Sequence, residues 1–272
     1  MTAAVEPWAG PQVPPATPWW PATRALAWRS LVGLARNPAA WVPGLAFPLF
    51  FAAVNTAALD RSTGLPGFPE VDSFLTFLLP ATLLQGVMLS ATTAGNDVAI
   101  DLQDGFFDRL LASPIPRVAL LLGRLAGAAV YSAILAVLFT TVLVAFGASV
   151  AAGPAGLAVI VLTAGLFGTG VGAFSMAVGF RTGSVERVNA FFPIFFTFVF
   201  LSSAFFPPQL AGGWFEVVAR VNPFSWMING LRHQVIVGWE WAGAVLAVGV
   251  AGCIAALMVG LAAMALRARL RR

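Results

Sequence analysis

Long apolar runs separated by short polar segments fill most of the chain. A helix needs roughly 20 mainly apolar residues to cross a bilayer, and several runs approach that length. Their length therefore favours helices that span a membrane over helices buried in a globular core. The pattern predicts an all-α integral membrane protein with six spans, at Trp41–Leu59, Phe74–Thr93, Leu120–Phe146, Ala155–Gly179, Phe191–Phe206 and Ala242–Leu266.

The segment before the first span has two parts. Residues 1–21 are rich in proline and lack a continuous apolar core with a small-residue cleavage site, so we expect a flexible cytosolic tail rather than a signal peptide. Residues 22–38 predict an amphipathic helix in the inner membrane interface, where it acts as an anchor alone or also contacts a partner. Its apolar face holds Leu26, Ala27, Leu31 and Leu34, and its polar face holds Arg29 and Arg36. Residues 39–272 then form a single transmembrane domain.

The composition agrees with a membrane protein and argues against two kinds of site. Hydrophobic residues make up 59% of the 272 residues and charged residues 10%, whereas soluble domains carry about a quarter charged residues. All 15 basic residues are arginine, and a Walker A phosphate loop needs a lysine. We therefore expect no ATP site and no cofactor on this chain. A single histidine, His233, makes a histidine-based metal site or catalytic triad implausible.

Arginines are distributed unevenly between the two sides of the predicted spans. With both termini inside, twelve arginines fall on the cytosolic side and three on the outer side. The positive-inside rule therefore predicts a multi-pass protein with both termini in the cytoplasm. The net charge of +4 then reflects topology, and nucleic-acid binding is not indicated. Arginine without lysine, together with abundant Ala, Gly and Val, suggests a GC-rich bacterial genome and hence a bacterial plasma membrane.

The loop predicted between the second and third spans is rich in charge. Its acids recur at spacings of four, three and four, which places them on one helical face: Asp97, Asp101, Asp104 and Asp108. Gly105 predicts a break, after which Asp104 caps a short helix that the prolines of residues 113–116 end. Arg124, just inside the third span, is expected to snorkel outward. Two interpretations remain open, namely a solvated acidic face and a short helix that docks on a soluble partner.

The predicted spans carry few ionisable groups. None of the eleven acidic residues falls in the middle of a span, where ion-coupled carriers usually place them. This argues against an ion-coupled secondary transporter, the main alternative from another class. In the fourth span, Gly168 and Gly172 have the spacing that lets helices approach closely. The fifth span is dense in phenylalanine, which lines a path for lipophilic cargo or simply faces lipid; the candidates for such a path are Phe192, Phe195 and Phe196.

Segment 207–241 is too polar for a simple span and too apolar for a free loop. Asn222 and Pro223 predict a helix start, with asparagine as the cap and proline in the first turn. The charged residues of this segment either pair with one another or line an exit path; they are Glu216, Arg220 and Arg232.

Two stretches resemble a known family. The run DLQDGFFDRLLASPIPRVALLLGR, residues 101–124, combines an acid, a glycine, an Asp-Arg pair and proline with an arginine that opens the third span. The run SSAFFPPQLAGGWFEVVARVNPFSWMINGLR, residues 202–232, combines a Phe-Pro pair, a tryptophan, Asn-Pro and a final Leu-Arg. Both look like the matching segments of type-2 ABC exporter permeases, especially the daunorubicin-resistance branch. The resemblance covers residues 22–270.

The resemblance implies a non-catalytic permease subunit that pairs with a second permease, identical or closely related. Two separate ABC ATPase subunits would bind ATP and Mg²⁺ and drive outward movement of a lipophilic or amphipathic drug or natural product. Export of lipids or polysaccharides is the alternative within the family.

The resemblance also implies roles for particular residues. The coupling helix that docks on the ATPase would consist of Asp104, Gly105, Phe106, Phe107, Asp108, Arg109, Leu110 and Leu111. The interfacial helix matches the family's connecting helix, so further candidates for partner contact are Asp97, Asp101, Arg29 and Arg36. Between spans five and six, the resemblance implies re-entrant short helices whose exit cap holds Glu216, Arg220, Asn222, Pro223 and Arg232.

Overall fold

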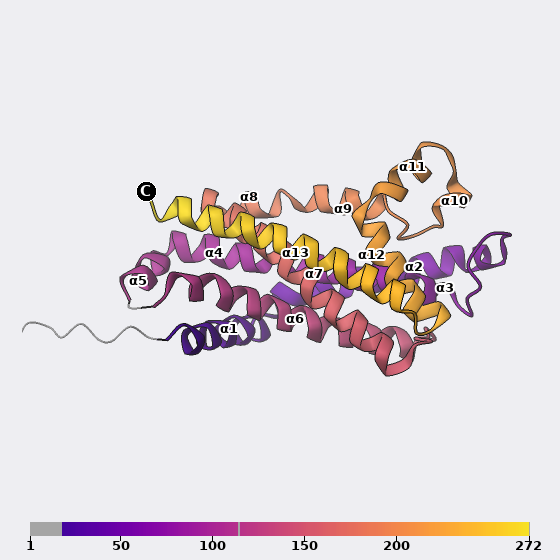
Figure 1. Cartoon of the computed structure of the whole chain (residues 1–272), viewed down its shortest axis with the longest axis horizontal. Coiled ribbons are helices and arrows are strands. Elements are labelled where there is room, and N and C mark those ends of the chain that lie inside the picture. Colours follow the sequence, from indigo (N-terminus) through magenta and orange to yellow (C-terminus); the bar gives the residue numbers. More distant parts are fainter. Residues whose placement is uncertain (1–17, 114, 272) are drawn as a thin grey trace, which may run out of the picture.

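The computed structural model describes residues 18–113 and 115–271, and every regular element in these ranges is helical (Figure 1). The long helices lie side by side along one axis, and most of the short ones cluster at its two ends. In chain order the elements are α1 Trp19–Ala35, α2 Pro38–Leu59, η1 Asp60–Gly64, α3 Phe74–Ala91, α4 Thr93–Gln103, α5 Phe106–Ala112, α6 Arg117–Ala145, α7 Gly153–Thr182, α8 Val185–Asn189, α9 Phe192–Phe200, α10 Pro208–Ala211, α11 Gly213–Val221, α12 Pro223–Arg232, η2 His233–Val237 and α13 Trp241–Arg269. Most of the tail predicted for residues 1–21 lies outside the described ranges.

Five stretches of helix among the described residues are long and apolar enough to span a membrane. They are Trp41–Gly64, Phe74–Gln103, Arg117–Ala145, Gly153–Thr182 and Trp241–Arg269. Each overlaps one of the predicted spans, so a helix of sufficient length and apolar character is confirmed at five of the six predicted positions. The second candidate is longer than predicted because Thr92 keeps a helical backbone and joins α3 to α4 with little interruption.

The remaining predicted span, the fifth in chain order at Phe191–Phe206, does not form one long helix. Only α9, with nine residues, is helical within it. Pro193 lacks a backbone N–H and occupies the first turn of α9. At the other end, the Asn222 side-chain amide donates to the carbonyls of Phe198 at 2.7 Å and Leu201 at 3.0 Å. These bonds replace the next helical turn, so the chain bends away before Phe206.

Helix α3 occupies the centre of the bundle. Every residue of α3 except Leu89 is buried. Its sequence is apolar on all sides, which is typical of a helix surrounded by other helices. Helices α2, α6 and α7 pack around it, and α12 contacts it near one end. Large side chains such as Phe74, Phe77 and Leu83 form the core with these neighbours.

Small residues let the long helices approach closely. A side chain added to Gly168 of α7 would collide with Ser132 of α6, and one on Gly172 would press on Ala128 of the same helix. The Gly168–Gly172 spacing therefore marks a real helix contact, as predicted. Farther along α7, Gly179 lies against the backbone of Gly95 in α4.

The helix predicted for residues 22–38 is present as α1. It runs along α6 rather than across the end of the bundle (Figure 1). Gly123 of α6 contacts Leu26 of α1, and Gly127 contacts Ser30, so the two helices point in the same direction. Ala22 and Leu26 are buried in this contact, whereas Arg29 is exposed and Arg36, past the end of α1, is exposed as well.

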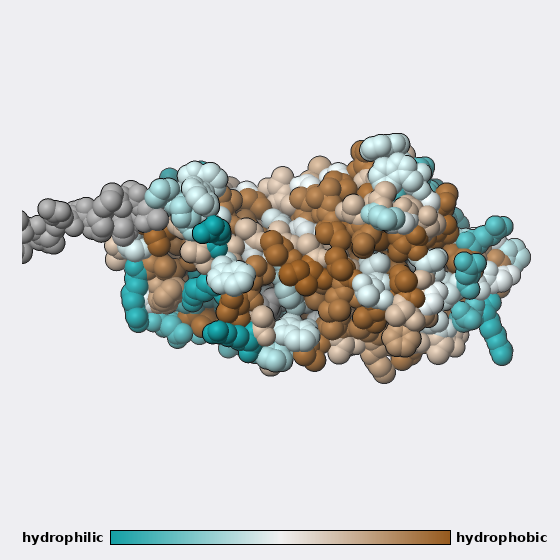
Figure 2. Space-filling model, turned by 90° about the horizontal axis from the view of Figure 1, so that it is seen from below, coloured by the Kyte–Doolittle hydropathy of each residue, from teal (hydrophilic) through white to brown (hydrophobic). Residues whose placement is uncertain are grey.

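The two ends of the bundle differ. The start of α1, the end of α13, α4 and α5 lie at one end, called here the α5 end, and η1, α10 and α11 lie at the other, called the η1 end (Figure 1). Between them, Figure 2 shows a broad apolar surface, with hydrophilic side chains toward both ends. Exposed tryptophans occur at Trp19, Trp20 and Trp28 in α1 and at Trp214, Trp226, Trp239 and Trp241 in the segment from α11 to the first residue of α13. An apolar band bordered by tryptophan is typical of a protein embedded in a bilayer.

Candidate functional site

The charged loop of the sequence forms the turn between α4 and α5. Helix α4 ends at Gln103, and Gly105 adopts a left-handed backbone with φ of 66°. No atom lies within 4 Å of the point that a side-chain carbon would occupy at this position, so the glycine serves the backbone conformation and does not relieve crowding. The break predicted near Asp104 is therefore present, and α4 and α5 are separate helices. The prediction that Asp104 caps the second helix is wrong, because Asp104 ends α4 and Gly105 is the N-cap of α5, without a side-chain hydrogen bond.

Helix α5 has one side that packs against the bundle and one side that is exposed to solvent. Phe107 is buried and its ring centroid lies 5.6 Å from that of Phe180 in α7. Leu110 and Leu111 are half-buried against the same core, and Gly105 and Phe106 are half-buried at the start of the helix. The charged residues stay outside, because Asp104, Asp108 and Arg109 are all exposed. The loop thus holds a helix that Phe107 anchors to the bundle and whose charges face solvent.

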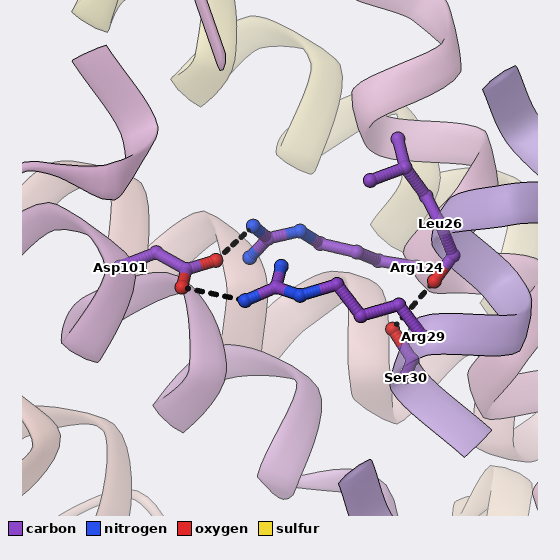
Figure 3. A network of polar contacts seen from close by, with 5 residues as sticks. All are labelled: Leu26, Arg29, Ser30, Asp101 and Arg124. Atoms are coloured by element: carbon purple, nitrogen blue, oxygen red, sulfur yellow. Dashed lines mark hydrogen bonds and ion pairs between the residues drawn. The ribbon is translucent and has the colours of Figure 1, made fainter. Parts of the chain in front are cut away.

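A network of one aspartate and two arginines lies beneath this loop (Figure 3). Arg124 of α6 donates from Nη2 to Oδ2 of Asp101 in α4. Arg29 of α1 donates from Nη2 to Oδ1 of the same carboxylate at 3.4 Å. The Arg29 guanidinium also lies 4.3 Å from the ring centroid of Phe106 in α5. This arginine–aspartate network therefore joins α1 to the three consecutive helices α4, α5 and α6, whose residues in the network lie 72 or more positions after Arg29 in the chain.

The network differs from the predicted acidic face in its location. Asp101 is 8% exposed and Arg124 is 6% exposed, so neither points outward. Arg124 does not snorkel, because a buried carboxylate accepts its hydrogen bond inside the bundle. Removing Asp101 would leave Arg124 without its only ion-pair partner among the described residues, and removing Arg124 would leave Asp101 with only the longer contact to Arg29. The structure thus brings Asp101 and Arg29 together within the chain, apart from the exposed acids of α5.

The remaining candidates for partner contact occupy other positions. Asp97 lies one turn before Asp101 and lines a cavity of about 770 Å³ that also touches Arg29, Asn96 and Asn189. Arg36 lies seven residues beyond Arg29, which is about 10 Å along a helix, so it is not part of the network. The structure therefore separates these two residues from α5.

Hydrogen bonds that the sequence analysis did not predict hold α4 against the α7–α8 turn. Gln103 donates from Nε2 to the carbonyl of Gly183 at 2.8 Å, and Asn96 donates from Nδ2 to Oδ1 of Asn189 at 3.2 Å. In the same turn, Ser184 donates to Glu186 at 2.6 Å, and this bond lowers the pKa of the Glu186 carboxyl. The feature of the sequence that could have indicated these bonds is the presence of the amide side chains of Asn96, Gln103 and Asn189 near the ends of apolar helices.

At the η1 end, the predicted exit-cap residues fall into separate contacts. Glu216 and Arg220 form an exposed pair, with 2.5 Å between Oε1 and Nη2, one turn apart on α11. Asn222 caps α12 by accepting a hydrogen bond from the Phe224 N–H at 2.9 Å, and Pro223 begins that helix. The predicted helix start is therefore confirmed. Arg232 is buried at the end of α12 and contacts neither Glu216 nor Arg220 through a hydrogen bond.

The phenylalanines of α9 contact other aromatic rings. Phe195 lies 5.1 Å from Phe174 of α7 between ring centroids, and Phe196 lies 6.0 Å from Phe47 of α2. Phe192 packs within α9 against Phe196, with tilted rings and 5.4 Å between their centroids. All three are half-buried. They pack α9 against α2 and α7, and their faces away from these contacts stay accessible.

Comparisons with known proteins agree on one family. A profile described as "ABC-2 type transporter" matches residues 21–236. The chain is 26% identical over 244 residues to the daunorubicin resistance ABC transporter permease protein DrrB1 of Streptomyces coeruleorubidus, covering 88% of this chain and 82% of that protein. It is 25% identical over 230 residues to a chain of Pyropia yezoensis described as a transport permease, ycf38, covering 82% and 77% of the two chains.

These matches confirm the resemblance drawn from residues 101–124 and 202–232, because the profile covers the first run whole and the second run whole. They also agree with the five long apolar helices of the structure. The chain belongs to the ABC-2 type transporter family and is a membrane subunit of an ABC transporter.

Proposed function

We propose that this chain is the permease subunit of an ATP-driven exporter that moves a lipophilic or amphipathic drug or natural product out of a bacterial cell. The relative from Streptomyces coeruleorubidus, which is named for daunorubicin resistance, supports this class of substrate. Two separate ATPase subunits would bind ATP and Mg²⁺, since this chain has no lysine for a Walker A loop. A second permease, identical or related, would complete the transport path.

In this proposal the α5 end faces the cytoplasm and the chain crosses the membrane six times. Arginines Arg109, Arg117 and Arg181 lie near the α5 end, in agreement with the positive-inside rule. The fifth crossing would be made by α8, α9 and the turns that follow, which succeed one another along the bundle in Figure 1. Helix α1 would be the connecting helix at the inner interface, and α10–α12 would form the re-entrant segment on the outer side.

The observation that carries the proposal is the division of α5 into two sides. Phe107 fixes the helix to α7, whereas Asp104, Asp108 and Arg109 are free to meet a soluble partner. A rigid, charged helix on a membrane subunit is suited to receive force from a docked ATPase. Exposed charges contribute specificity to such docking more than raw affinity.

The structure also offers a physical route from α5 to the centre of the bundle. Helix α4 immediately precedes the turn at Gly105 that leads into α5. At its other end, α4 is joined through Thr92 to the buried helix α3. Arg29 contacts both Phe106 and Asp101, so a displacement of α5 would also act on α1 and, through Arg124, on α6. Coupling further requires that the ATPase bind two arrangements of these helices with different affinity.

Two alternatives make different demands on the chain. Export of lipid or polysaccharide would use the same ATPase-driven architecture and differ only in cargo. An ion-coupled carrier would need an acid near the middle of a span. Within the second span candidate, Asp97 and Asp101 occupy the final third, and Asp101 is already paired with two arginines.

The test is purification of the chain from its native membranes in mild detergent, followed by identification of bound chains and an ATPase assay. A stoichiometric partner with a lysine-bearing Walker A loop, and ATPase activity in the complex, would support the proposal. A chain that purifies alone and moves solute in a proton or sodium gradient would overturn it in favour of the ion-coupled carrier.

A further inference from the structure

Arg232 is a buried cation surrounded by neutral groups. It is 7% exposed, and its guanidinium lies 3.5 Å from the ring centroid of Phe77 in α3. It donates from Nε to the Phe77 carbonyl at 3.2 Å and from Nη2 to the Ala204 carbonyl at 2.7 Å. A longer bond of 3.4 Å runs from Nη1 to Oδ1 of Asn229. Each of these acceptors is uncharged.

Across residues 18–113 and 115–271, no carboxylate pairs with Arg232. Glu216 pairs with Arg220 at 2.5 Å, and Glu240 lies 2.6 Å from Nδ1 of His233. A buried charge without a counter-ion is unfavourable, and carbonyl dipoles and one aromatic ring compensate it only in part. A guanidinium has five N–H donors, so some of them stay available beyond the three bonds described.

These groups open onto a cavity at the η1 end. The cavity has a volume of about 400 Å³, within the range of small-ligand sites. Its polar lining includes Arg232, Ser225 and Asn229, and its apolar lining includes Phe77 and Ile236. Such a lining matches a ligand with one anionic group and an apolar remainder. Arg220 and His233 also line the cavity, and no aspartate or glutamate is among its described lining residues, so no carboxylate of the lining repels an anion.

The cavity lies among the tryptophans of the η1 end. Trp226 lines it directly and is 44% exposed. Trp239 and Trp241 follow shortly after η2 and pack together at 4.9 Å between ring centroids, and Trp214 is exposed on α11. Tryptophan is enriched at the level of lipid headgroups. This depth is where phosphate groups of membrane lipids are abundant.

We propose that the Arg232 cavity binds the phosphate group of an anionic amphiphile, with the guanidinium as its charge partner and the apolar lining around the adjoining carbons. A charged hydrogen bond from arginine to phosphate is among the stronger contacts that proteins make. The ligand is a membrane phospholipid in this proposal, and a free phosphate compound is the other source of the same chemistry. The inference is independent of the cargo and of the ATPase partner.

The binding test uses the purified full-length chain and three probes measured by native mass spectrometry. Dioctanoyl phosphatidylglycerol carries both phosphate and chains, dioctanoylglycerol carries the chains alone, and glycerol 3-phosphate carries the phosphate alone. Saturable binding of the phosphatidylglycerol only, or of it far more tightly than the other two, supports a lipid ligand. Equal binding of glycerol 3-phosphate supports the phosphate site and assigns it to a free compound. Equal binding of dioctanoylglycerol, or no saturable binding, overturns the proposal.

Variants separate a ligand site from a purely structural role of Arg232. Arg232→Gln should weaken phosphatidylglycerol binding about tenfold or more, the loss expected for hydrogen bonds to a charged group. Because this variant also disturbs bonds to Phe77 and Ala204, a second variant leaves Arg232 intact. Val237→Asp places a carboxylate at the exposed rim of the cavity and should weaken binding, whereas Val217→Asp, at an exposed site of α11 outside the lining, should not. Equal affinity of the Val237→Asp and Val217→Asp variants would contradict the proposed site.

Discussion

Arg124 of α6 donates a hydrogen bond to Asp101 of α4, and both side chains are buried at the α5 end of the bundle. In the sequence these residues are the last and the first of the run that resembles the family's cytoplasmic loop, residues 101–124. The loop between them therefore begins and ends at one ion pair, which closes its base.

We predict that the two halves of this ion pair depend on each other. Asp101→Leu alone should destabilise the folded protein by about 3–5 kcal/mol, because it leaves Arg124 buried without its carboxylate. Arg124→Leu alone should cost less than that, because Arg29 still contacts the Asp101 carboxylate at 3.4 Å. The double variant should be more stable than either single variant, since no charge then remains buried at this pair. Thermal unfolding in one detergent measures this. A double variant that loses the sum of the two single effects would show that the residues act independently.

Gly105 should be sensitive to any side chain. Gly105→Ala should cost about 1–2 kcal/mol, because its left-handed φ of 66° is unfavourable for other residues. The matched control is Gly33→Ala in α1, where a side chain likewise meets no atom within 4 Å and no left-handed φ is present. That control should be neutral or slightly stabilising. Equal destabilisation by both variants, in thermal unfolding, would contradict the backbone role of Gly105.

The exposed charges of α5 should control docking of the ATPase. Asp108→Arg with Arg109→Asp preserves net charge and leaves Phe107 in place, so the variant should insert and fold normally but lose bound ATPase and cargo efflux. Such swapped charges meet like charges on a partner, which is unfavourable. Co-purification and efflux of a fluorescent lipophilic cation or natural product are the measurements.

A charge swap at the opposite end provides the control for α5. Glu216→Arg with Arg220→Glu exchanges an exposed ion pair of α11 at the η1 end. It should retain the ATPase. Normal efflux by the α5 variant would refute its coupling role, whatever the control does.

The contact between α6 and α7 should depend on the absence of a side chain at Gly168. Gly168→Ala should destabilise the protein by about 1–3 kcal/mol, because its methyl group would collide with Ser132. Ser132→Gly should recover much of this loss by making room from the other side. Gly249→Ala in α13, where nothing lies within 4 Å, should have little effect. Failure of Ser132→Gly to rescue would mean that the strain arises elsewhere.

Much of the fold could be predicted from apolar length alone. The five long helices follow runs of about 20 or more apolar residues, and the break at Gly105 and the cap at Asn222 follow local residue chemistry. The interruption of the helix predicted at Phe191–Phe206 could not be predicted in this way. It depends on hydrogen bonds from Asn222, more than twenty positions later in the chain.

In the candidate site, too, some features follow from the local sequence and others depend on residues far away in the chain. The exposure of Asp108 and Arg109 on a short helix follows from charge and from the residues around them. The burial of Asp101 does not, since it depends on Arg124 and Arg29, which lie 23 and 72 positions away. An acid that recurs at helical spacing shows which face it shares, and only the packing of neighbouring helices decides whether that face meets water.

The central position of α3 has a consequence for how the bilayer can influence this protein. Since α3 is buried among α2, α6, α7 and shorter elements such as α12, changes in membrane thickness or lateral pressure reach it through its neighbouring helices. A thinner bilayer would be met first by tilt of the lipid-facing helices, at a modest free-energy change per ångström of mismatch. Helix α3, which is connected to α5 through α4, is thereby insulated from fluctuations of the surrounding lipid.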